Sequence, residues 1–271
     1  MSDLLRVRDL TVAFHGVPVV DAIDFAVPPG GALGIVGESG SGKSMTSLAI
    51  MGLLPKGATR AGSIEFDGGE LTTLNERRMR AVRGDRIAMV FQDPLSSLNP
   101  YYTVGTQIAE AYRSHRSGVS RRAARKAAIE AMERVHIRDA ARRVDEYPHQ
   151  FSGGMRQRVM IAMALSTEPS LIIADEPTTA LDVTVQAQIL DLLAEVRRDT
   201  GAALILITHD LAVVSEVTDT LIVMRHGKAV ESGTAEQIFC DPRHPYTRAL
   251  LDAVPRIDDE IGELQTLGGD S

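Results

Sequence analysis

The sequence is poor in several residue types, and each shortage excludes a class of protein. It has one cysteine, Cys240, in 271 residues, so no disulfide can form within the chain, which agrees with a reducing cytosol. Its apolar runs, such as residues 202–207, are far below the roughly 20 residues needed to span a bilayer. Residues 1–6 show no basic stretch followed by an apolar core, so we expect no secretory signal. Any role at a membrane must therefore go through a partner.

Basic residues are also in the minority. The 29 lysines and arginines against 36 aspartates and glutamates give a net charge of −7. This balance argues against a nucleic-acid partner, because such binding depends on basic side chains that neutralise phosphates. One basic run, residues 121–126, is interpreted as the solvated face of a helix. With 44% hydrophobic and 24% charged residues, the composition suits a globular chain with one large domain, or one domain with a subdomain and a tail.

The most informative stretch is a glycine-rich turn between an apolar run and a helical pattern. Residues 32–36 predict a buried strand, and residues 45–54 predict a helix. The turn fits G-x-x-x-x-G-K-[ST], whose glycines let backbone N–H groups converge on an anion at the start of a helix. Lys43 would reach the β and γ phosphates of a nucleoside triphosphate, and the Ser44 hydroxyl would ligate Mg²⁺. The residues expected to bind the phosphates are Gly37, Glu38, Ser39, Gly40, Ser41, Gly42, Lys43 and Ser44.

The remaining patterns predict an α/β fold. Apolar strands expected at residues 171–175 and 203–207 flank a helix at residues 183–198, which is the β-α-β rhythm of an open parallel sheet. Residues 104–143 show only helical patterning. Other strands are expected at residues 4–14, 17–27, 86–91, 221–224 and 228–231, with a short strand and turn at residues 63–68 and a loop at residues 57–62.

We therefore predict a P-loop NTPase core, with a mostly parallel sheet, an antiparallel β edge and an inserted α-helical subdomain. The predicted segments are residues 1–92 (nucleotide-binding core), 93–155 (helical subdomain), 156–235 (the core again) and 236–271 (C-terminal tail).

Polar residues follow three of the expected strands, at the edge where an open α/β sheet binds its ligands. Asp175 would hold Mg²⁺ through water, and Glu176 would take a proton from the attacking water or orient it. His209 could hydrogen-bond a γ-phosphate. Gln92 could bridge Mg²⁺ and the water. Paired acids and a lone histidine at strand ends are otherwise more often structural, so these roles depend on the phosphate-binding turn.

A second anion-binding turn lies far along the chain from the first. Ser152, Gly153 and Gly154 open a helical pattern, in which the serine is a competent N-cap and the glycines expose backbone N–H groups. A helix cap without a ligand is the simpler alternative. Two such turns indicate that a γ-phosphate could be clamped between two subunits. Phe14, one of only 6 phenylalanines in a chain without tryptophan, could stack on a purine or pack in the core.

Together these residues resemble the ATP-binding-cassette (ABC) family over roughly residues 4–235. The matching motifs are Walker A (residues 37–44), the Q-loop (Gln92), the signature motif (151–155), Walker B (171–176), the D-loop (180–182), the switch histidine (His209) and the adenine-stacking aromatic (Phe14). The resemblance implies an ATPase that uses ATP and Mg²⁺. It also implies a head-to-tail dimer, in which ATP lies between the Walker A motif of one chain and the signature turn of the other.

A narrower resemblance, to the ATPases of oligopeptide and dipeptide importers, rests on residues 90–100, 147–155, 175–184 and 242–251. It implies two integral-membrane permease subunits, an external solute-binding protein and a place at the cytoplasmic face of the membrane. It also implies a related second ATPase subunit, which favours a heterodimer over a homodimer. Cys240 stands alone where some longer relatives carry a cysteine cluster, so we expect no iron–sulfur centre. Nickel and metallophore importers are similar too, so the cargo stays open.

The competing class is a cassette ATPase without transport, such as one that acts on ribosomes or DNA. Those usually carry two cassettes in one chain or a long coiled coil, and neither is visible in this sequence. A P-loop kinase would not need the turn at Ser152. The expectation is a hydrolytic importer cassette in which Gln92, Glu176 and His209 act on ATP.

Overall fold

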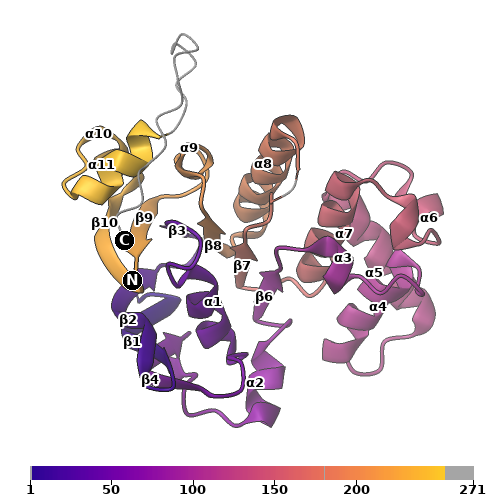
Figure 1. Cartoon of the computed structure of the whole chain (residues 1–271). Coiled ribbons are helices and arrows are strands. Elements are labelled where there is room, and N and C mark those ends of the chain that lie inside the picture. Colours follow the sequence, from indigo (N-terminus) through magenta and orange to yellow (C-terminus); the bar gives the residue numbers. More distant parts are fainter. Residues whose placement is uncertain (1, 180, 254–271) are drawn as a thin grey trace.

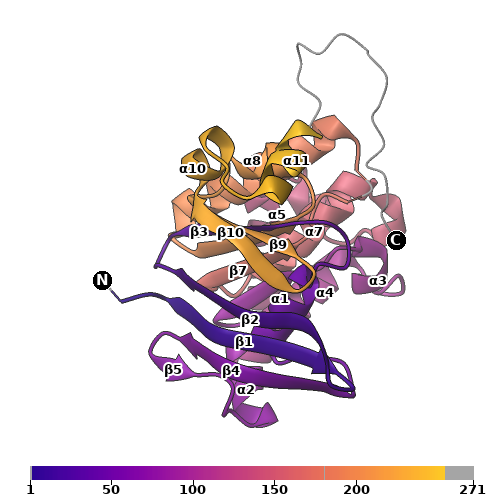
Figure 2. The same ribbon diagram turned by 60° about the vertical axis from the view of Figure 1, so that its left-hand side comes forward.

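The computed structural model describes residues 2–179 and 181–253, which form two β-sheets with helices around them (Figures 1 and 2). The larger sheet has the strand order β10 (Lys228–Thr234), β9 (Thr220–Arg225), β3 (Ala32–Val36), β8 (Ala203–Thr208), β7 (Leu171–Asp175) and β6 (Ile87–Val90). Its neighbouring strands run parallel, except that β10 pairs antiparallel with β9. Every residue of β3, β7 and β8 is buried, which explains their continuous apolar sequences. The predicted α/β class and sheet type are confirmed.

The smaller sheet is antiparallel and covers one side of the larger one. Its strand order is β2 (Val17–Val27), β1 (Leu5–Phe14), β4 (Ala58–Phe66) and β5 (Gly69–Glu70). The expectation of a loop over residues 57–62 was wrong, because β4 begins at Ala58, opposite Phe14. Gly62 has a φ of +91° and lies against Asp9, where the register of β1 shifts. This glycine accommodates a β-bulge inside a strand instead of marking a loop.

Apolar side chains on the two faces of the larger sheet join two hydrophobic clusters. Along β8, Ile205 and Ile207 belong to the cluster shared with the antiparallel sheet and α1 (Lys43–Met51), whereas Leu204 and Leu206 belong to the cluster shared with the other helices. The six-stranded sheet is therefore the middle layer, and its packing on both faces holds the carboxyl ends of the parallel strands rigidly.

Most of the helices lie beyond β6 or over the outer face of the larger sheet (Figure 1). The described helices besides α1 are α2 (Glu76–Val82), α3 (Pro94–Ser97), α4 (Val104–His115), α5 (Arg121–Arg134), α6 (Ala140–Arg143), a 3₁₀ turn (Pro148–Gln150), α7 (Gly153–Leu165), α8 (Val183–Thr200), α9 (Leu211–Val214), α10 (Ala235–Cys240) and α11 (Pro245–Asp252). The segment boundary proposed at residue 155 lies inside α7. None of these described helices combines the length and the apolar character needed to cross a membrane.

The predicted helical patterning over residues 104–143 corresponds to α4, α5 and α6. Side chains of Thr103, Ser120 and Ser152 accept backbone hydrogen bonds at the starts of α4, α5 and α7. The basic side chains of residues 121–126 lie on the exposed face of α5, as interpreted from the sequence. Within this part α7 packs against α4, α5 and β6, so it joins the helical subdomain to the larger sheet.

Glu70 ties β5 to β4 through several hydrogen bonds. Its carboxylate accepts from the backbone N–H groups of Ile64 (3.0 Å) and Thr72 (2.9 Å), and from the hydroxyl groups of Thr72 (2.6 Å) and Ser63. Burial acts to raise the pKa of Glu70, but these hydrogen bonds outweigh it and lower the pKa from 4.5 to about 2. The ionised form of this side chain is therefore part of the folded sheet.

We predict that Glu70→Gln lowers the free energy of unfolding at neutral pH by about 1–2 kcal/mol. Because the folded-state pKa is depressed, the contribution is fully present above pH 4.5 and is lost as the pH falls to about 2. Chemical denaturation over that pH range measures the difference between variant and wild type, which should shrink in acid. Glu65→Gln, on the paired strand β4, is the control. Equal losses in both variants, or a loss independent of pH, would contradict the prediction.

Candidate nucleotide-binding and hydrolysis site

The predicted phosphate-binding loop joins β3 to α1. Gly37, Gly40 and Gly42 have φ angles of +151°, +81° and +101°, which favour glycine. Space also requires glycine at two of these positions, because a Cβ at Gly37 would lie 2.2 Å from Met224 O, and one at Gly42 would lie 2.5 Å from Val19 O. In the described part of the chain no side chain caps α1, so the N–H groups of its first turn can face an anion.

Lys43 is the first residue of α1, and its side chain folds back over the loop. The Nζ atom donates hydrogen bonds to Gly37 O (2.7 Å) and Glu38 O (2.8 Å). Lys43 is only 4% exposed, and burial lowers the pKa of its ammonium group, although the carboxylates of Glu176 and Asp175 oppose this shift. A cation in this position favours an anionic ligand with several oxygen atoms.

Asp175 ends β7 and faces the start of α1. Its Oδ1 accepts a hydrogen bond from the Ser44 hydroxyl (3.0 Å), and its Oδ2 accepts one from the Ser47 hydroxyl (3.4 Å). Burial raises the pKa of Asp175, which is 7% exposed, and these hydrogen bonds oppose the rise. Sequence reasoning missed Ser47, although its spacing of three from Ser44 puts both on one helix face.

The donors at this point fit Mg²⁺. Hydroxyl and carboxylate oxygens are hard ligands of the kind that Mg²⁺ prefers. Over residues 2–179 and 181–253 no three His, Cys, Asp or Glu side chains are grouped to hold a metal by themselves. The pair Ser44 and Asp175 therefore suits an ion that takes its remaining ligands from phosphate and water.

The carboxylate of Glu176, directly after β7, meets side chains from three other parts of the chain. Its Oε2 accepts hydrogen bonds from Gln92 Nε2 (3.0 Å) and Thr179 Oγ1 (2.9 Å) and lies 3.5 Å from His209 Nδ1. Glu176 has a φ of +46°, uncommon for this residue type, and its N–H donates to Ile207 O (2.8 Å). The structure thus brings Gln92, Glu176 and His209 together and adds Thr179, which sequence reasoning missed.

A cavity of about 840 Å³ contains most of the predicted nucleotide-binding residues. Its walls are Phe14, Val19, Glu38, Ser39, Gly40, Gly42, Lys43, Ser44, Met45, Gln92, Glu176, His209 and Leu250. The volume lies in the range of ligand pockets, roughly 300–1,000 Å³. Gly37, Ser41 and Asp175 are buried next to these walls. Leu250 was not predicted and comes from the C-terminal helix α11.

The Ser152 turn lies apart from this cavity. Ser152 and Gly153 are exposed, and the Ser152 hydroxyl accepts a hydrogen bond from Met155 N (3.4 Å). A Cβ at Gly154 would lie 2.4 Å from Val185 Cγ1, so α7 starts close against α8. Of the predicted D-loop, residue 180 lies outside the described residues. Within one chain, the two anion-binding turns therefore do not share a wall of the nucleotide cavity.

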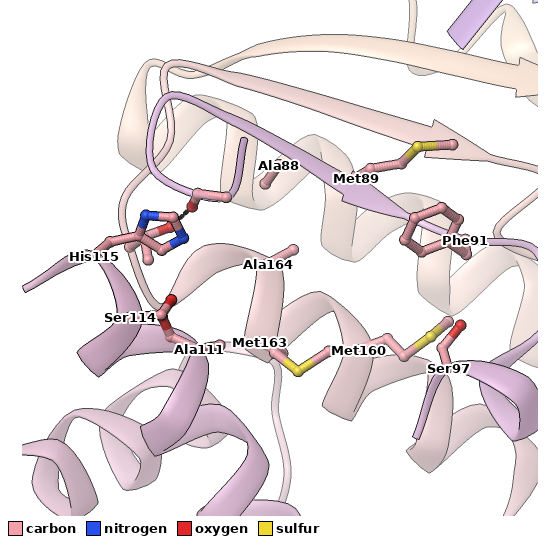
Figure 3. A pocket seen from close by; sticks show the side chains of 12 residues that line it. Ala88, Met89, Phe91, Ser97, Ala111, Ser114, His115, Met160, Met163 and Ala164 are labelled. Carbon is pink, nitrogen blue, oxygen red and sulfur yellow. Dashed lines mark hydrogen bonds between the residues drawn. The ribbon is translucent and has the colours of Figure 1, made fainter. Parts of the chain in front are cut away.

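A second cavity, of about 490 Å³, lies between β6 and helices α4 and α7 (Figure 3). Met89, Phe91, Met160, Met163 and Ala164 give it mostly apolar walls. Phe91 is 41% exposed. This residue precedes Gln92, so two consecutive residues line two different cavities.

Comparison with known proteins identifies the class. The family model described as "ABC transporter" matches residues 20–179. The dimeric post-hydrolysis structure of the ATP-binding cassette MJ0796 bound to ADP and Pi is 26% identical with a TM-score of 0.75, covering 85% of this chain and 98% of that one. The structure of cbiO1 from Clostridium perfringens is 27% identical with a TM-score of 0.76, covering 89% and 92%. The chain belongs to the ABC transporter family, and it is an ATPase that binds ATP.

More particular relatives match along almost the whole chain. The dipeptide transport ATP-binding protein DppD of Escherichia coli (strain K12) is 52% identical over 271 residues, which cover 98% of this chain and 83% of the relative. The oligopeptide transport ATP-binding protein OppD of Salmonella typhimurium is 49% identical, covering 98% and 80%. A second model, "Oligopeptide/dipeptide transporter, C-terminal region", matches residues 230–271. The resemblance predicted from the motifs is confirmed, while the roles of single site residues stay predictions.

We predict that Asp175→Asn removes the Mg²⁺-dependent part of ATP binding without destabilising the nucleotide-free protein. The variant deletes a carboxylate whose charged form is disfavoured by burial, and with it the anion that suits Mg²⁺. Calorimetric titration with ATP, in Mg²⁺ and in EDTA, measures binding, and thermal unfolding measures stability. Asp191→Asn, on the exposed side of α8, is the control. The prediction fails if Mg²⁺ still strengthens ATP binding in Asp175→Asn, or if its Tm drops by more than about 5 °C.

Proposed function

We propose that this chain is the ATP-hydrolysing subunit of an importer of dipeptides or oligopeptides, located at the cytoplasmic face of a membrane. The names of the matching relatives and the match of the C-terminal region support this cargo class. In the proposal, two integral-membrane permease subunits, a related second ATPase subunit and an external solute-binding protein complete the transporter. No nucleic acid takes part, in keeping with the net charge of −7.

The observation that carries the hydrolytic role is the cluster at Glu176 Oε2, beside the phosphate-binding loop. Glu176 takes the proton of the attacking water, whose oxygen bonds to the γ-phosphorus as the bond to the β–γ bridging oxygen breaks. Gln92 and His209 position the water and the γ-phosphate, because both side chains reach the same carboxylate oxygen. Thr179 holds the carboxylate in place through its 2.9 Å hydrogen bond.

The phosphate-binding loop and Phe14, which line the same cavity as Glu176, bind the nucleotide. The loop of residues 37–44 surrounds the phosphates, Lys43 contacts the β and γ phosphates, and Phe14 stacks on the adenine. Ser44, Asp175 and Gln92 would hold Mg²⁺, which supplies charge neutralisation at the phosphate oxygens. This arrangement is supported by the common wall of the 840 Å³ cavity and by the contact of Ser44 with Asp175.

The second anion-binding turn acts in a second subunit. Ser152, Gly153 and Gly154 complete the γ-phosphate site of the partner ATPase, and the partner's turn completes the site of this chain. Two features support this: Ser152 and Gly153 are exposed, and the turn does not line the chain's own cavity. Hydrolysis then opens the pair, and the helical subdomain carries the movement to the permease.

We predict that Glu176→Gln lowers the rate of ATP hydrolysis at least about hundredfold while ATP binding persists, since general-base catalysis contributes about 10²–10⁴-fold. ATP should then hold two cassettes together, which size-exclusion chromatography with light scattering would show as an ATP-dependent dimer. Glu110→Gln, at an exposed position of α4, is the control. Unchanged turnover in Glu176→Gln would remove Glu176 from its assigned role.

The second cavity, of about 490 Å³ beside β6, is an apolar groove, and it is the proposed binding site for a segment of a permease subunit. It is lined by methionine and phenylalanine side chains, which adapt to a partner surface. The groove also adjoins the nucleotide cavity along the chain, because Phe91 lines the groove and the next residue, Gln92, hydrogen-bonds to Glu176. A permease segment bound in this groove would therefore contact Phe91, the residue next to Gln92.

We predict that Met163→Glu, which places a charge in this groove, abolishes the peptide-stimulated ATPase activity of the complex reconstituted with its permeases and binding protein. ATP binding by the chain itself should stay unchanged. Ala123→Glu, on the exposed face of α5, is the matched control. In the wild-type complex, stimulation of ATPase activity by peptides supports the peptide cargo class, whereas stimulation only by a nickel chelate overturns it. Full stimulation in Met163→Glu would rule out the groove as the contact.

A further inference from the structure

The C-terminal helix α11 contacts the phosphate-binding loop. Helix α11 (Pro245–Asp252) lies beyond the edge strand β10 and its neighbour β9, together with α10 (Figures 1 and 2). Its Tyr246 is only 6% exposed, and the phenolic oxygen accepts a hydrogen bond from the backbone N–H of Glu38 (3.2 Å). Leu250, one turn further along α11, lines the nucleotide cavity. Helix α11 thus contributes Leu250 to the wall of the nucleotide cavity, and its Tyr246 hydrogen-bonds to the backbone of the phosphate-binding loop.

Several contacts hold Tyr246 in this position. The Glu231 carboxylate of β10 accepts from the backbone N–H groups of Arg243 (2.7 Å) and His244 (3.1 Å), and His244 Nδ1 accepts from Tyr246 N (3.2 Å) at the start of α11. The Arg225 guanidinium lies 4.7 Å from the centre of the Tyr246 ring. Burial raises the pKa of the Tyr246 phenol, and the Glu38 carboxylate adds to the rise, so the hydroxyl keeps its proton at neutral pH.

The hydrogen bond of Tyr246 and a hydrogen bond of Lys43 involve the same peptide group. The N–H of Glu38 and the C=O of Gly37 belong to one trans peptide group, so they point in opposite directions. Tyr246 holds the N–H end, and Lys43 Nζ holds the carbonyl end at 2.7 Å. When Lys43 turns to the phosphates of ATP, the carbonyl end loses that partner and Tyr246 still holds the other end.

We propose that Tyr246 is a positioning residue of the nucleotide site, which keeps the peptide group between Gly37 and Glu38 oriented while Lys43 exchanges its loop carbonyls for the phosphates of ATP. The C-terminal helix is then a functional wall of the pocket, and Leu250 forms the surface next to the nucleotide. A tyrosine that only fastened α11 to the body of the protein would affect stability and leave nucleotide affinity unchanged.

The test is Tyr246→Phe in the full chain, which removes the acceptor oxygen and keeps the ring under Arg225. Without ATP, Lys43 still orients this peptide group in the variant, whereas with ATP bound neither partner does, so the cost falls on the complex. One hydrogen bond to a neutral group corresponds to about three- to tenfold, and the Kd for ATP should rise by up to that factor. In the reconstituted complex, KM for ATP should rise by a similar factor while kcat stays within about twofold. Tyr112→Phe, on α4 outside the nucleotide cavity, makes the same chemical change and should alter neither constant.

Two results would overturn the proposal. One is a Kd and KM within about twofold of wild type in Tyr246→Phe, whether or not the melting temperature falls. The second comes from the unmodified chain, where amide hydrogen exchange resolved at Glu38 reports the hydrogen bond directly. Slow exchange of this amide both without nucleotide and with ATP bound supports the proposal. Exchange at the rate of an open loop in either condition contradicts it.

Discussion

The buried ammonium group of Lys43 is the feature on which the rest of the site depends. A buried cation without oxygen partners is unfavourable, and here the carbonyl groups of Gly37 and Glu38 supply them. Those carbonyls converge only because the loop is tightly curved, with glycines where backbone oxygens of Met224 and Val19 come close. The oxygens of a triphosphate carry more negative charge than carbonyls do, so the burial that disfavours the free cation would strengthen the contact with ATP that we propose for it.

The end of β6 connects the nucleotide cavity to the apolar groove within two residues. Val90 pairs with Ala174 in the parallel register of β6 and β7, which brings Gln92 level with Glu176. The 3.0 Å hydrogen bond between them follows from this register. Phe91, the residue between Val90 and Gln92, lines the apolar groove. Neighbouring residues at the end of one strand therefore line the nucleotide cavity and the apolar groove.

The sequence was sufficient to predict the features that depend on local pattern. Continuous apolar strands, a glycine-rich turn and polar residues at strand ends together indicated the α/β class and the edge of the sheet at which the nucleotide cavity lies. Two of the features that were missed, Ser47 and Thr179, lie three residues from predicted site residues, and the others depend on tertiary register or on long-range packing. The bulge at Gly62 needs the position of β1 beside β4, and Thr179 reaches Glu176 only through the turn after β7. Tyr246 is 208 residues from Glu38, a separation that no local pattern reports.

Strand β9, which lies between the edge strand β10 and β3, explains how such distant segments meet at one loop. Its Met224 carbonyl lies against Gly37, and the next residue, Arg225, lies over the ring of Tyr246. The phosphate-binding loop is thus packed on one side by β9, and α11 is packed on the same strand by the following side chain. One strand therefore supports both α11 and the phosphate-binding loop. The region matched by the oligopeptide/dipeptide C-terminal model, residues 230–271, includes part of β10, beside this strand, and α11, whose Leu250 lines the nucleotide cavity.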